Sequence, residues 1–314
     1  ISWRRARLDI ALITADNKIA FRDQIPLTEE EDKVDKITST FFNIMKPKVG
    51  DRRIMGLCII IPGIIDAENK RILSTVIGVG YSDPVVQRFE EAFHDYPFCL
   101  LNDTACFAYA EYVFANITEP NFAYINVSKG VGACLFANGK MLRGAGSNAT
   151  QFGHFSIDRN GPLCACGNHG CVERVVGENA LTERAEACGI DLTRFAGRKP
   201  LYCDIGAMAE DGDAHAKELI KDLAVDLSFA ISNLITLFNP SLVVIGGMGV
   251  NLGPFFLSNI RDEVQNSGFK EFVSNTWIQY STLGLDSELG GAARYYIDHY
   301  YDFFEQMQGG LYAD

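Results

Sequence analysis

One stretch of the sequence concentrates side chains that bind metal ions. Three cysteines and a histidine fall within eighteen residues: His154, Cys164, Cys166 and Cys171. Gly167 and Gly170 separate the last two cysteines and permit the tight turns that converging ligands require. Three thiolates and one imidazole suit a tetrahedral zinc ion, and a full set of four protein ligands is typical of a structural site. His169 is a second candidate for the histidine ligand, and the spacing does not choose between the two.

The alternative interpretation of this cluster is a group of free thiols beside an unrelated histidine. Ligands this dense, with glycines between them, rarely occur by chance, which favours the metal site. The chain has nine cysteines, an odd number and too few for a disulfide scaffold of 314 residues. No secretory signal opens the sequence. Together these features predict a cytoplasmic protein.

A second group with chemical potential is the pair Asn102–Asp103. It follows an apolar run at 98–101, which predicts a buried strand, and it opens a segment rich in alanine and aromatics at 103–114, which predicts a helix. A carboxylate at this junction could accept a hydrogen bond from a ligand hydroxyl and take its proton during phosphoryl transfer. Asp103 could instead serve only as the cap of its helix.

Strands and helices alternate along the chain, which predicts an α/β protein of two lobes, each with a mixed sheet, separated by a cleft. In the first third we expect strands at 7–13, 55–61 and 98–101, and helices at 28–45, 84–93 and 103–114. Thr28 and Glu31 form a capping box at the start of the first helix. Further along we expect strands at 122–127, 132–136 and 242–245, and helices at 177–188, 208–211, 215–238 and 290–304.

The composition disfavours two classes of partner. Lys and Arg number 28 against 40 Asp and Glu, a net charge of −12, so this part of the protein is not expected to contact nucleic acid. Basic residues concentrate only at Arg4, Arg5 and Arg7. No apolar run reaches the roughly 18 residues that span a bilayer, so no membrane partner is expected.

Residues 149–173 resemble a known signature. They read A-T-Q-F-G-H and then C-A-C-G-N-H-G-C-V-E, which is similar to the signature of the ROK family of bacterial sugar kinases and sugar-responsive transcriptional regulators. Further matches follow in the family's order: Pro62-Gly63, Asn102-Asp103, Asn138-Gly139, Gly246-Gly247 and Gly291-Ala292. The resemblance implies a two-lobed actin-like (ribonuclease H-like) ATPase fold with an interlobe cleft. It also implies a structural zinc on Cys164, Cys166, Cys171 and His154, rather than His169.

The same resemblance implies a division of the chain and a set of sugar contacts. Residues 1–117 would form the N-terminal lobe, completed by a C-terminal helix at about 290–314, and 118–289 the larger lobe with the zinc site. The implied ligand-binding residues are Gly63, Asn102, Asp103, Gln151, His154 and Glu173. In the kinases of the family, the residue matching Asp103 is the catalytic base. Gln151 departs from the family's Glu, which weakens one contact to a sugar hydroxyl because the charge is lost.

The sequence departs from the family's kinases where ATP phosphates would bind. Their Asp-x-Gly-Gly-Thr loop is replaced by residues 2–6, S-W-R-R-A, and their Gly-Thr-Gly-x-Gly loop by residues 128–132, S-K-G-V-G. The arginines could bind phosphate as side chains, but they do not replace close-approach backbone positions. Vestiges of the nucleotide site would be Gly130, Gly132, Gly246 and Gly247. These losses argue against ATP and magnesium as ligands.

The departures resemble the NagC/XylR-type regulator branch of the family. We therefore expect the effector-binding and oligomerisation domain of a regulator, a homodimer or homotetramer without kinase activity that binds a sugar or sugar phosphate. DNA would be bound by an N-terminal winged helix, which we expect to be absent from this chain because it opens at Ile1 in strand-like sequence. One alternative is an ATP-dependent sugar kinase with a degenerate phosphate loop and Asp103 as its base. Another is a zinc-stabilised scaffold that no longer binds sugar.

Overall fold

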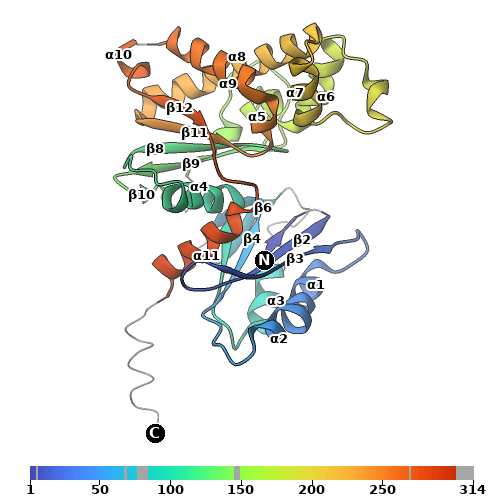
Figure 1. Ribbon diagram of the computed structural model, residues 1–314, viewed down its shortest axis with the longest axis vertical. Coiled ribbons are helices and arrows are strands. Elements are labelled where there is room, and N and C mark those ends of the chain that lie inside the picture. The colour runs from blue at the N-terminus through green and yellow to red at the C-terminus, as the bar shows by residue number, and fades with distance from the viewer. Residues whose placement is uncertain (5, 67–68, 76–83, 145–148, 269, 302–314) are drawn as a thin grey trace. The chain divides into compact units, whose positions relative to one another are not determined.

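The chain divides into two compact units in the computed structural model, which describes residues 1–301 apart from 5, 67–68, 76–83, 145–148 and 269 (Figure 1). Unit 1 comprises Ile1–Ile117, Gly144–Asn148 and Leu283–Asp314, and unit 2 comprises Thr118–Arg143 and Ala149–Thr282. The first stretch of unit 1 ends at Ile117. The return to unit 1 falls at Leu283 rather than near residue 290, so residues 283–289 group with unit 1 and not with the larger unit.

Unit 1 is built on a mixed five-stranded sheet. Its strands in spatial order are β3 (Ile19–Pro26), β2 (Arg7–Ile13), β1 (Ser2–Trp3), β4 (Leu57–Ile61) and β7 (Phe98–Asn102). The first two pairings, β3 with β2 and β2 with β1, are antiparallel, whereas β1–β4 and β4–β7 are parallel. A separate two-stranded sheet joins β5 (Gly63–Asp66) to β6 (Arg71–Thr75). The apolar run 57–61 is suited to β4 because this strand is covered on both faces.

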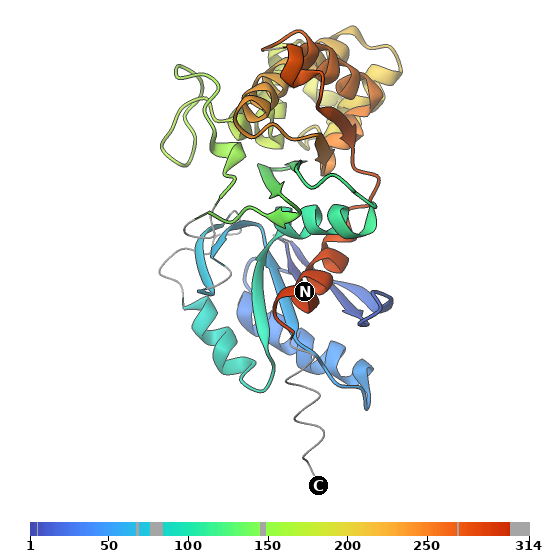
Figure 2. The same ribbon diagram turned by 90° about the vertical axis from the view of Figure 1, so that its left-hand side faces the viewer.

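Helices cover both faces of this sheet because successive side chains of a strand point to opposite sides. Ile59 and Ile61 of β4 pack in the core that includes the first helices, whereas the thiol of Cys58 donates to the carbonyl of Ala292 on the other side. The helices of unit 1 are α1 (Lys33–Thr40), α2 (Lys46–Val49), α3 (Val85–Ala92), α4 (Asp103–Phe114) and α11 (Ser287–His299), with a π turn, η1 (Phe41–Met45), between α1 and α2. Helices α4 and α11 pack against each other (Figure 2).

The start of the first helix differs from the prediction at Thr28. Helix α1 begins at Lys33, and the carboxylate of Asp32 caps it by accepting from the amide of Asp35 at 3.0 Å. Glu31 still accepts from the amide of Thr28 at 2.8 Å, so the predicted box forms a turn ahead of the helix. The guanidinium of Arg88 from α3 holds both carboxylate oxygens of Asp32, at 2.9 and 2.7 Å. This tertiary contact selects the later cap.

Unit 2 has a second mixed five-stranded sheet. In spatial order its strands are β10 (Lys140–Met141), β9 (Val131–Ala137), β8 (Phe122–Val127), β11 (Leu242–Gly246) and β12 (Trp277–Tyr280). Strands β8, β11 and β12 are parallel, and β9 is antiparallel to both of its neighbours. The sequence did not indicate β12, because this edge strand has only four residues, of which Ile278 alone is buried, and it begins with the exposed Trp277.

The helices of unit 2 lie on one side of its sheet (Figures 1 and 2). They are α5 (Val172–Val176), α6 (Glu178–Ala187), α7 (Tyr202–Glu210), α8 (Ala214–Phe238), α9 (Gly253–Gln265) and α10 (Lys270–Val273), with short 3-10 turns η2 (Phe152–His154), η3 (Leu192–Phe195) and η4 (Met248–Leu252). Helix α8 supplies the longest buried stripe of the core. Helix α7 begins earlier than the predicted 208, and α9 and α10 were not predicted.

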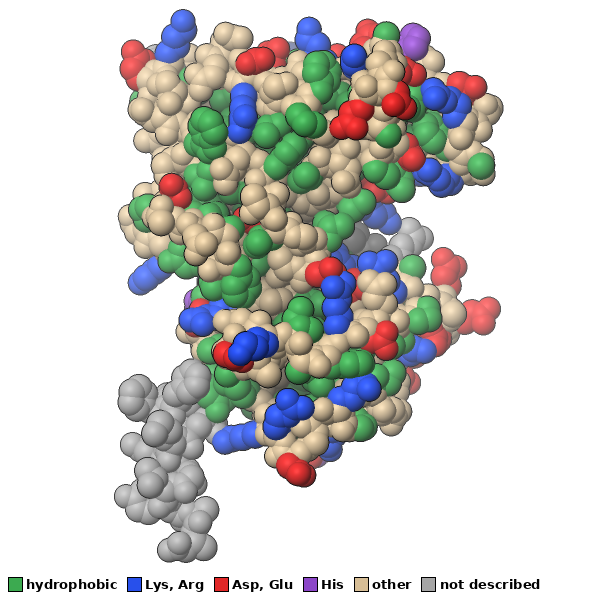
Figure 3. Space-filling view, viewed as in Figure 1, with side chains coloured by type: hydrophobic (Ala, Val, Ile, Leu, Met, Phe, Trp, Pro, Cys, Tyr) green, Lys and Arg blue, Asp and Glu red, His purple; other side chains and the backbone are tan. Residues whose placement is uncertain are grey.

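The surface of the described residues carries mixed charge. Acidic and basic side chains are interspersed on the faces of both units that Figure 3 presents. Among the described helices, none combines the length and the hydrophobicity needed to cross a membrane.

The contact between α4 and α11 requires a glycine at position 291. A Cβ atom there would lie 2.0 Å from the carbonyl oxygen of Cys106 and 2.9 Å from the amide of Ala110, so Gly291→Ala must push the helices apart. We expect a loss of about 2 kcal/mol in the free energy of unfolding, measured by urea denaturation. Gly284→Ala is the control, because an added Cβ at Gly284 meets nothing within 4 Å. Equal stability of the two variants would contradict this packing argument.

Candidate functional site

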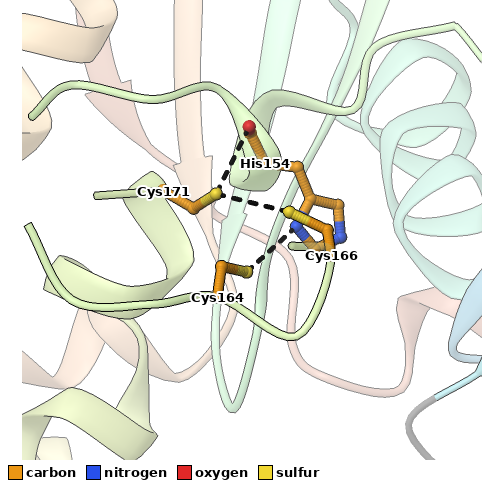
Figure 4. Close-up of side chains that lie close together, drawn as sticks. All are labelled: His154, Cys164, Cys166 and Cys171. Atoms are coloured by element: carbon orange, nitrogen blue, oxygen red, sulfur yellow. Dashed lines mark hydrogen bonds between the residues drawn. The ribbon is translucent and has the colours of Figure 1, made fainter. Parts of the chain in front are cut away.

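The candidate metal ligands converge in unit 2 (Figure 4). His154 ends the turn η2, Cys164 and Cys166 lie on the loop that follows it, and Cys171 is the residue before α5. Isolated bridges between Ser156 and Cys171 and between Leu163 and His169 fold the loop back on itself. Gly170 is needed at the second bridge, because its φ is +60° and a Cβ would lie 1.9 Å from the carbonyl oxygen of Asp158.

The geometry of the cluster fits one tetrahedral ion. All four donor atoms lie within 4.8 Å of one another. The sulfurs of Cys166 and Cys171 are 3.6 Å apart, and the sulfur of Cys164 is 3.6 Å from Nδ1 of His154. Around tetrahedral zinc these separations are about 3.8 Å and about 3.5 Å, from metal–ligand bonds of about 2.3 and 2.0 Å. The donors therefore fit a closed four-ligand site.

The other candidate histidine lies outside this group. Nδ1 of His169 is 3.0 Å from the carbonyl oxygen of Gly161, and His169 is not among the four converging donors. The structure thus places His154, and not His169, beside the thiols. Because Nδ1 of His154 faces Cys164, Nε2 is the nitrogen that remains for another partner.

The glycine-rich segments of unit 2 lie tightly against the protein's own side chains. A Cβ on Gly247 would lie 2.2 Å from Oδ1 of Asn126 and 2.5 Å from Oγ of Ser128, and one on Gly130 would lie 2.5 Å from Oε2 of Glu173. Gly132 and Gly246 are ladder residues, both paired with Asn126. A Cβ would therefore clash at Gly130, Gly246 and Gly247, whereas Gly132 is placed by its pairing in the sheet.

Two backbone amides in these segments already have internal acceptors. The amide of Met248 donates to Oγ of Ser128 at 3.1 Å, and the amide of Val131 donates to Oε2 of Glu173 at 3.2 Å. Amides of this kind, in loops and at the N-terminal ends of helices, are the usual donors to phosphate oxygens. Here they are engaged, and one of their acceptors is a carboxylate that repels an anion.

The remaining predicted ligand-binding residues of unit 2 lie just before and just after the candidate metal ligands in the sequence. Gln151 is exposed and precedes η2, on the same turn that ends at His154. Glu173 lies in the first turn of α5, two residues after Cys171. Both residues are therefore close in the sequence to the candidate metal ligands.

Unit 1 brings Gly63, Asn102 and Asp103 together. Nδ2 of Asn102 donates to the carbonyl oxygen of Gly63 at 2.6 Å and to Oδ1 of Asp103 at 3.2 Å. Oδ1 of Asn102 caps helix α4 by accepting from the amide of Ala105 at 2.9 Å. The cap of this helix is therefore Asn102 and not Asp103, because Asp103 is already the first helical residue.

Burial controls the charge of Asp103. Loss of solvent raises the pKa of its carboxyl group, and the positive charge of Arg4 and the amide of Thr104 oppose that rise. The Thr104 amide donates to Oδ1 at 2.7 Å. A carboxylate so placed can accept a hydrogen bond from a hydroxyl group.

Arg4 belongs to a buried ionic group that the sequence did not indicate. Its guanidinium pairs with Glu288 at the start of α11 and lies 3.5 Å from Oδ2 of Asp9, whose Oδ1 is 2.8 Å from Nε of Arg7. The side chain of Glu288 is only 1% exposed, and its Oε2 has no hydrogen-bond partner among the described residues. Burial raises the pKa of Glu288 to about 7, although Arg4 opposes the shift. No spacing in the sequence links position 4 to position 288.

The metal cluster predicts that wild-type protein purified without chelator holds about one divalent ion per chain. Cys171→Ser should abolish binding and lower the melting temperature by about 5–10 °C, because metal binding stabilises the folded state. Elemental analysis by mass spectrometry and a thermal melt test this. Cys203→Ser is the control, since Cys203 is exposed and lies outside the cluster. A metal content unchanged in Cys171→Ser would contradict the assignment.

Glu288 predicts a pH dependence of stability. Its folded-state pKa of about 7 lies above the ordinary 4.5, so between these pH values the folded state binds more protons than the unfolded state. The contribution of this group to stability is greatest below pH 4.5 and is lost as the pH rises to about 7. The free energy of unfolding of Glu288→Gln, relative to that of wild type, should therefore rise by about 3 kcal/mol from pH 5 to pH 8, as measured by urea unfolding. The stability of Glu30→Gln, a change at an exposed site, should depend on pH in the same way as that of wild type.

Comparison with known proteins places the chain in a family. The ROK family profile matches residues 5–298. The chain is similar to the xylose repressor of Bacillus subtilis (strain 168), with 26% identity over 250 residues that cover 79% of this chain and 62% of that protein. It thus spans less than two thirds of that relative's length.

Two solved structures share the fold. A ROK family transcriptional regulator, a homologue of the Escherichia coli Mlc protein, superposes with a TM-score of 0.79 at 25% identity, over 93% of this chain and 75% of that one. A ROK family glucokinase from Streptomyces griseus, in complex with glucose and AMPPNP, superposes with a TM-score of 0.75 at 21% identity, over 94% and 97%. The α/β fold with mixed sheets is therefore common to kinases and regulators. On the profile match along nearly its whole length, the chain belongs to the ROK family.

Proposed function

We propose that this chain is the effector-binding part of a sugar-responsive ROK transcriptional regulator and that it does not phosphorylate its ligand. The observation that carries the proposal is that two backbone amides of the glycine-rich segments are bound by side chains of the chain itself. The amides of Met248 and Val131 donate to Ser128 and Glu173. The similarity to a xylose repressor and to a ROK regulator structure supports the same conclusion.

The polar groups suited to a sugar are retained in both units. In unit 1, Asn102 and Asp103 would contact hydroxyl groups beside Gly63, with Asp103 as the charged acceptor. In unit 2, Glu173, Nε2 of His154 and the amide of Gln151 are the candidate contacts. Gln151 retains one acceptor and gains two donors relative to a glutamate, so it can still bind a hydroxyl.

The metal site would be a structural zinc. Four protein ligands leave no open position for a substrate, and the ion would hold the loop 155–171 in place. It would thereby fix the orientation of His154 and of the segment that carries Glu173. Thiolate ligands require a reducing environment, which favours the cytoplasm.

DNA contact would belong to a part of the full-length protein outside these residues. The net charge of −12 opposes DNA binding by this chain, and the chain spans only 62% of the xylose repressor. We expect a homodimer or homotetramer that presents two DNA-binding segments. A sugar would act by binding one state of the full-length regulator better than the other and so shifting a pre-existing equilibrium.

A sugar kinase is the second candidate, because Asp103 stands where a base would be needed. For a kinase, the phosphates of ATP would have to replace Ser128 and Glu173 as acceptors of the Met248 and Val131 amides. Saturable binding of a non-hydrolysable ATP analogue with magnesium, at micromolar to low-millimolar concentration, would favour the kinase. We expect no such binding to folded protein.

The test is calorimetric titration of this chain with pentoses, hexoses and N-acetylated amino sugars. At least one sugar should bind, and Asp103→Asn should weaken it about tenfold or more because a charged hydrogen bond is lost. Asp51→Asn is the control, since Asp51 is an exposed acid of the same unit. Failure of every sugar to bind, by folded protein, would contradict the proposal and leave a scaffold that does not bind sugar.

A further inference from the structure

We infer that the buried ionic group of Arg4, Asp9 and Glu288 makes this protein select an uncharged sugar over a phosphorylated one. The inference rests on the proposed function, since it concerns the ligand that Asp103 would contact. The sequence alone leaves a sugar and a sugar phosphate open, because arginines that could bind phosphate stand where the phosphate loop of the kinases would be. The structure shows which carboxylates pair with the charge of Arg4.

Arg4 is engaged by two carboxylates of its own chain. It pairs with Glu288 from α11 and lies 3.5 Å from Asp9 of β2, while its amide donates to the carbonyl of Arg7 at 2.9 Å and closes the turn between β1 and β2. Glu288 and Asp9 are 1% and 4% exposed, whereas the Arg4 side chain is 29% exposed. The side of the Arg4 guanidinium that faces the protein interior is therefore occupied by the buried carboxylates of Glu288 and Asp9.

The charge balance of the group is unfavourable for an anion. Asp9 lies beside both Arg4 and Arg7, Glu288 pairs with Arg4, and the charge of Asp103 also acts on Arg4, so three carboxylates are balanced by two guanidinium groups. With every member ionised the group carries one net negative charge. A phosphate ester would add almost two further negative charges to a site where burial strengthens electrostatic repulsion.

Arg4 also has little freedom to turn toward a phosphate. If it did, Glu288 would lose its cation, and the Oε2 atom of Glu288 already lacks a hydrogen-bond partner among the described residues. A buried carboxylate left without its cation is strongly unfavourable. A sugar hydroxyl does not require Arg4 to leave Glu288, because the hydroxyl can donate to Asp103 while the ion pair stays intact.

Inorganic phosphate tests the inference without knowledge of the sugar. In calorimetric titrations at pH 8, where Glu288 is ionised, wild type should show no saturable phosphate binding below about 10 mM. Glu288→Gln keeps the shape of the side chain and removes one negative charge, so it should strengthen phosphate binding at least fivefold. Asp286→Asn is the matched control: it removes the same charge two residues earlier, from an exposed pair with Arg22, and should behave as wild type.

A second arm compares each sugar that binds with its phosphate ester, for instance glucose with glucose 6-phosphate. Wild type should bind the ester at least tenfold more weakly, and Glu288→Gln should narrow that ratio at least fivefold. The inference is overturned if the ester binds wild type as well as the sugar does. It is equally overturned if wild type binds phosphate below 1 mM and Arg4→Met abolishes that binding. If no sugar or ester binds, the proposed function fails, and the phosphate arm still decides what the ionic group does to an anion.

Discussion

The ion pair between Arg4 and Glu288 links the most distant parts of unit 1 and can form only in the folded unit. It joins the turn after the first strand to the start of α11, 284 positions later in the sequence. Because one partner is almost completely buried, the pair forms only when β1, β2 and α11 are all in place. Helix α11 then packs on α4, the helix that Asn102 caps and Asp103 begins. The last helix of the unit and the first turn of the sheet thus support the same polar group.

A comparable constraint acts in unit 2 through four side chains with metal-binding chemistry. The loop between η2 and α5 has few hydrogen bonds of regular structure, and its two ends approach each other at His154 and Cys171, whose thiol donates to the carbonyl of His154 at 3.4 Å. Helix α5 follows at once and carries Glu173 to the amide of Val131. Backbone hydrogen bonds across the loop, such as Ile157 to Gly170 and Cys164 to Asn168, hold the four candidate ligands close together.

The same fold serves kinases and regulators because the chemistry lies in loops on a common scaffold. A glucokinase with a TM-score of 0.75 shares the sheets and helices of this chain. In this chain, two backbone amides of the glycine-rich segments are bound by side chains of the protein itself. Side chains that accept from those amides satisfy donors that would otherwise lack a partner within the protein.

The sequence by itself determined the α/β class, the strands at 7–13 and 122–127, helix 103–114 and the group of candidate metal ligands, since hydrophobic periodicity and ligand spacing are local properties. It did not determine β12, whose exposed Trp277 conceals an edge strand, or the start of α1, where Arg88 from another helix selects the cap. It also did not choose between His154 and His169 by spacing, and it did not connect Arg4 with Glu288. These outcomes depend on which distant groups share a buried, poorly solvated space, and only the tertiary structure brings such groups together.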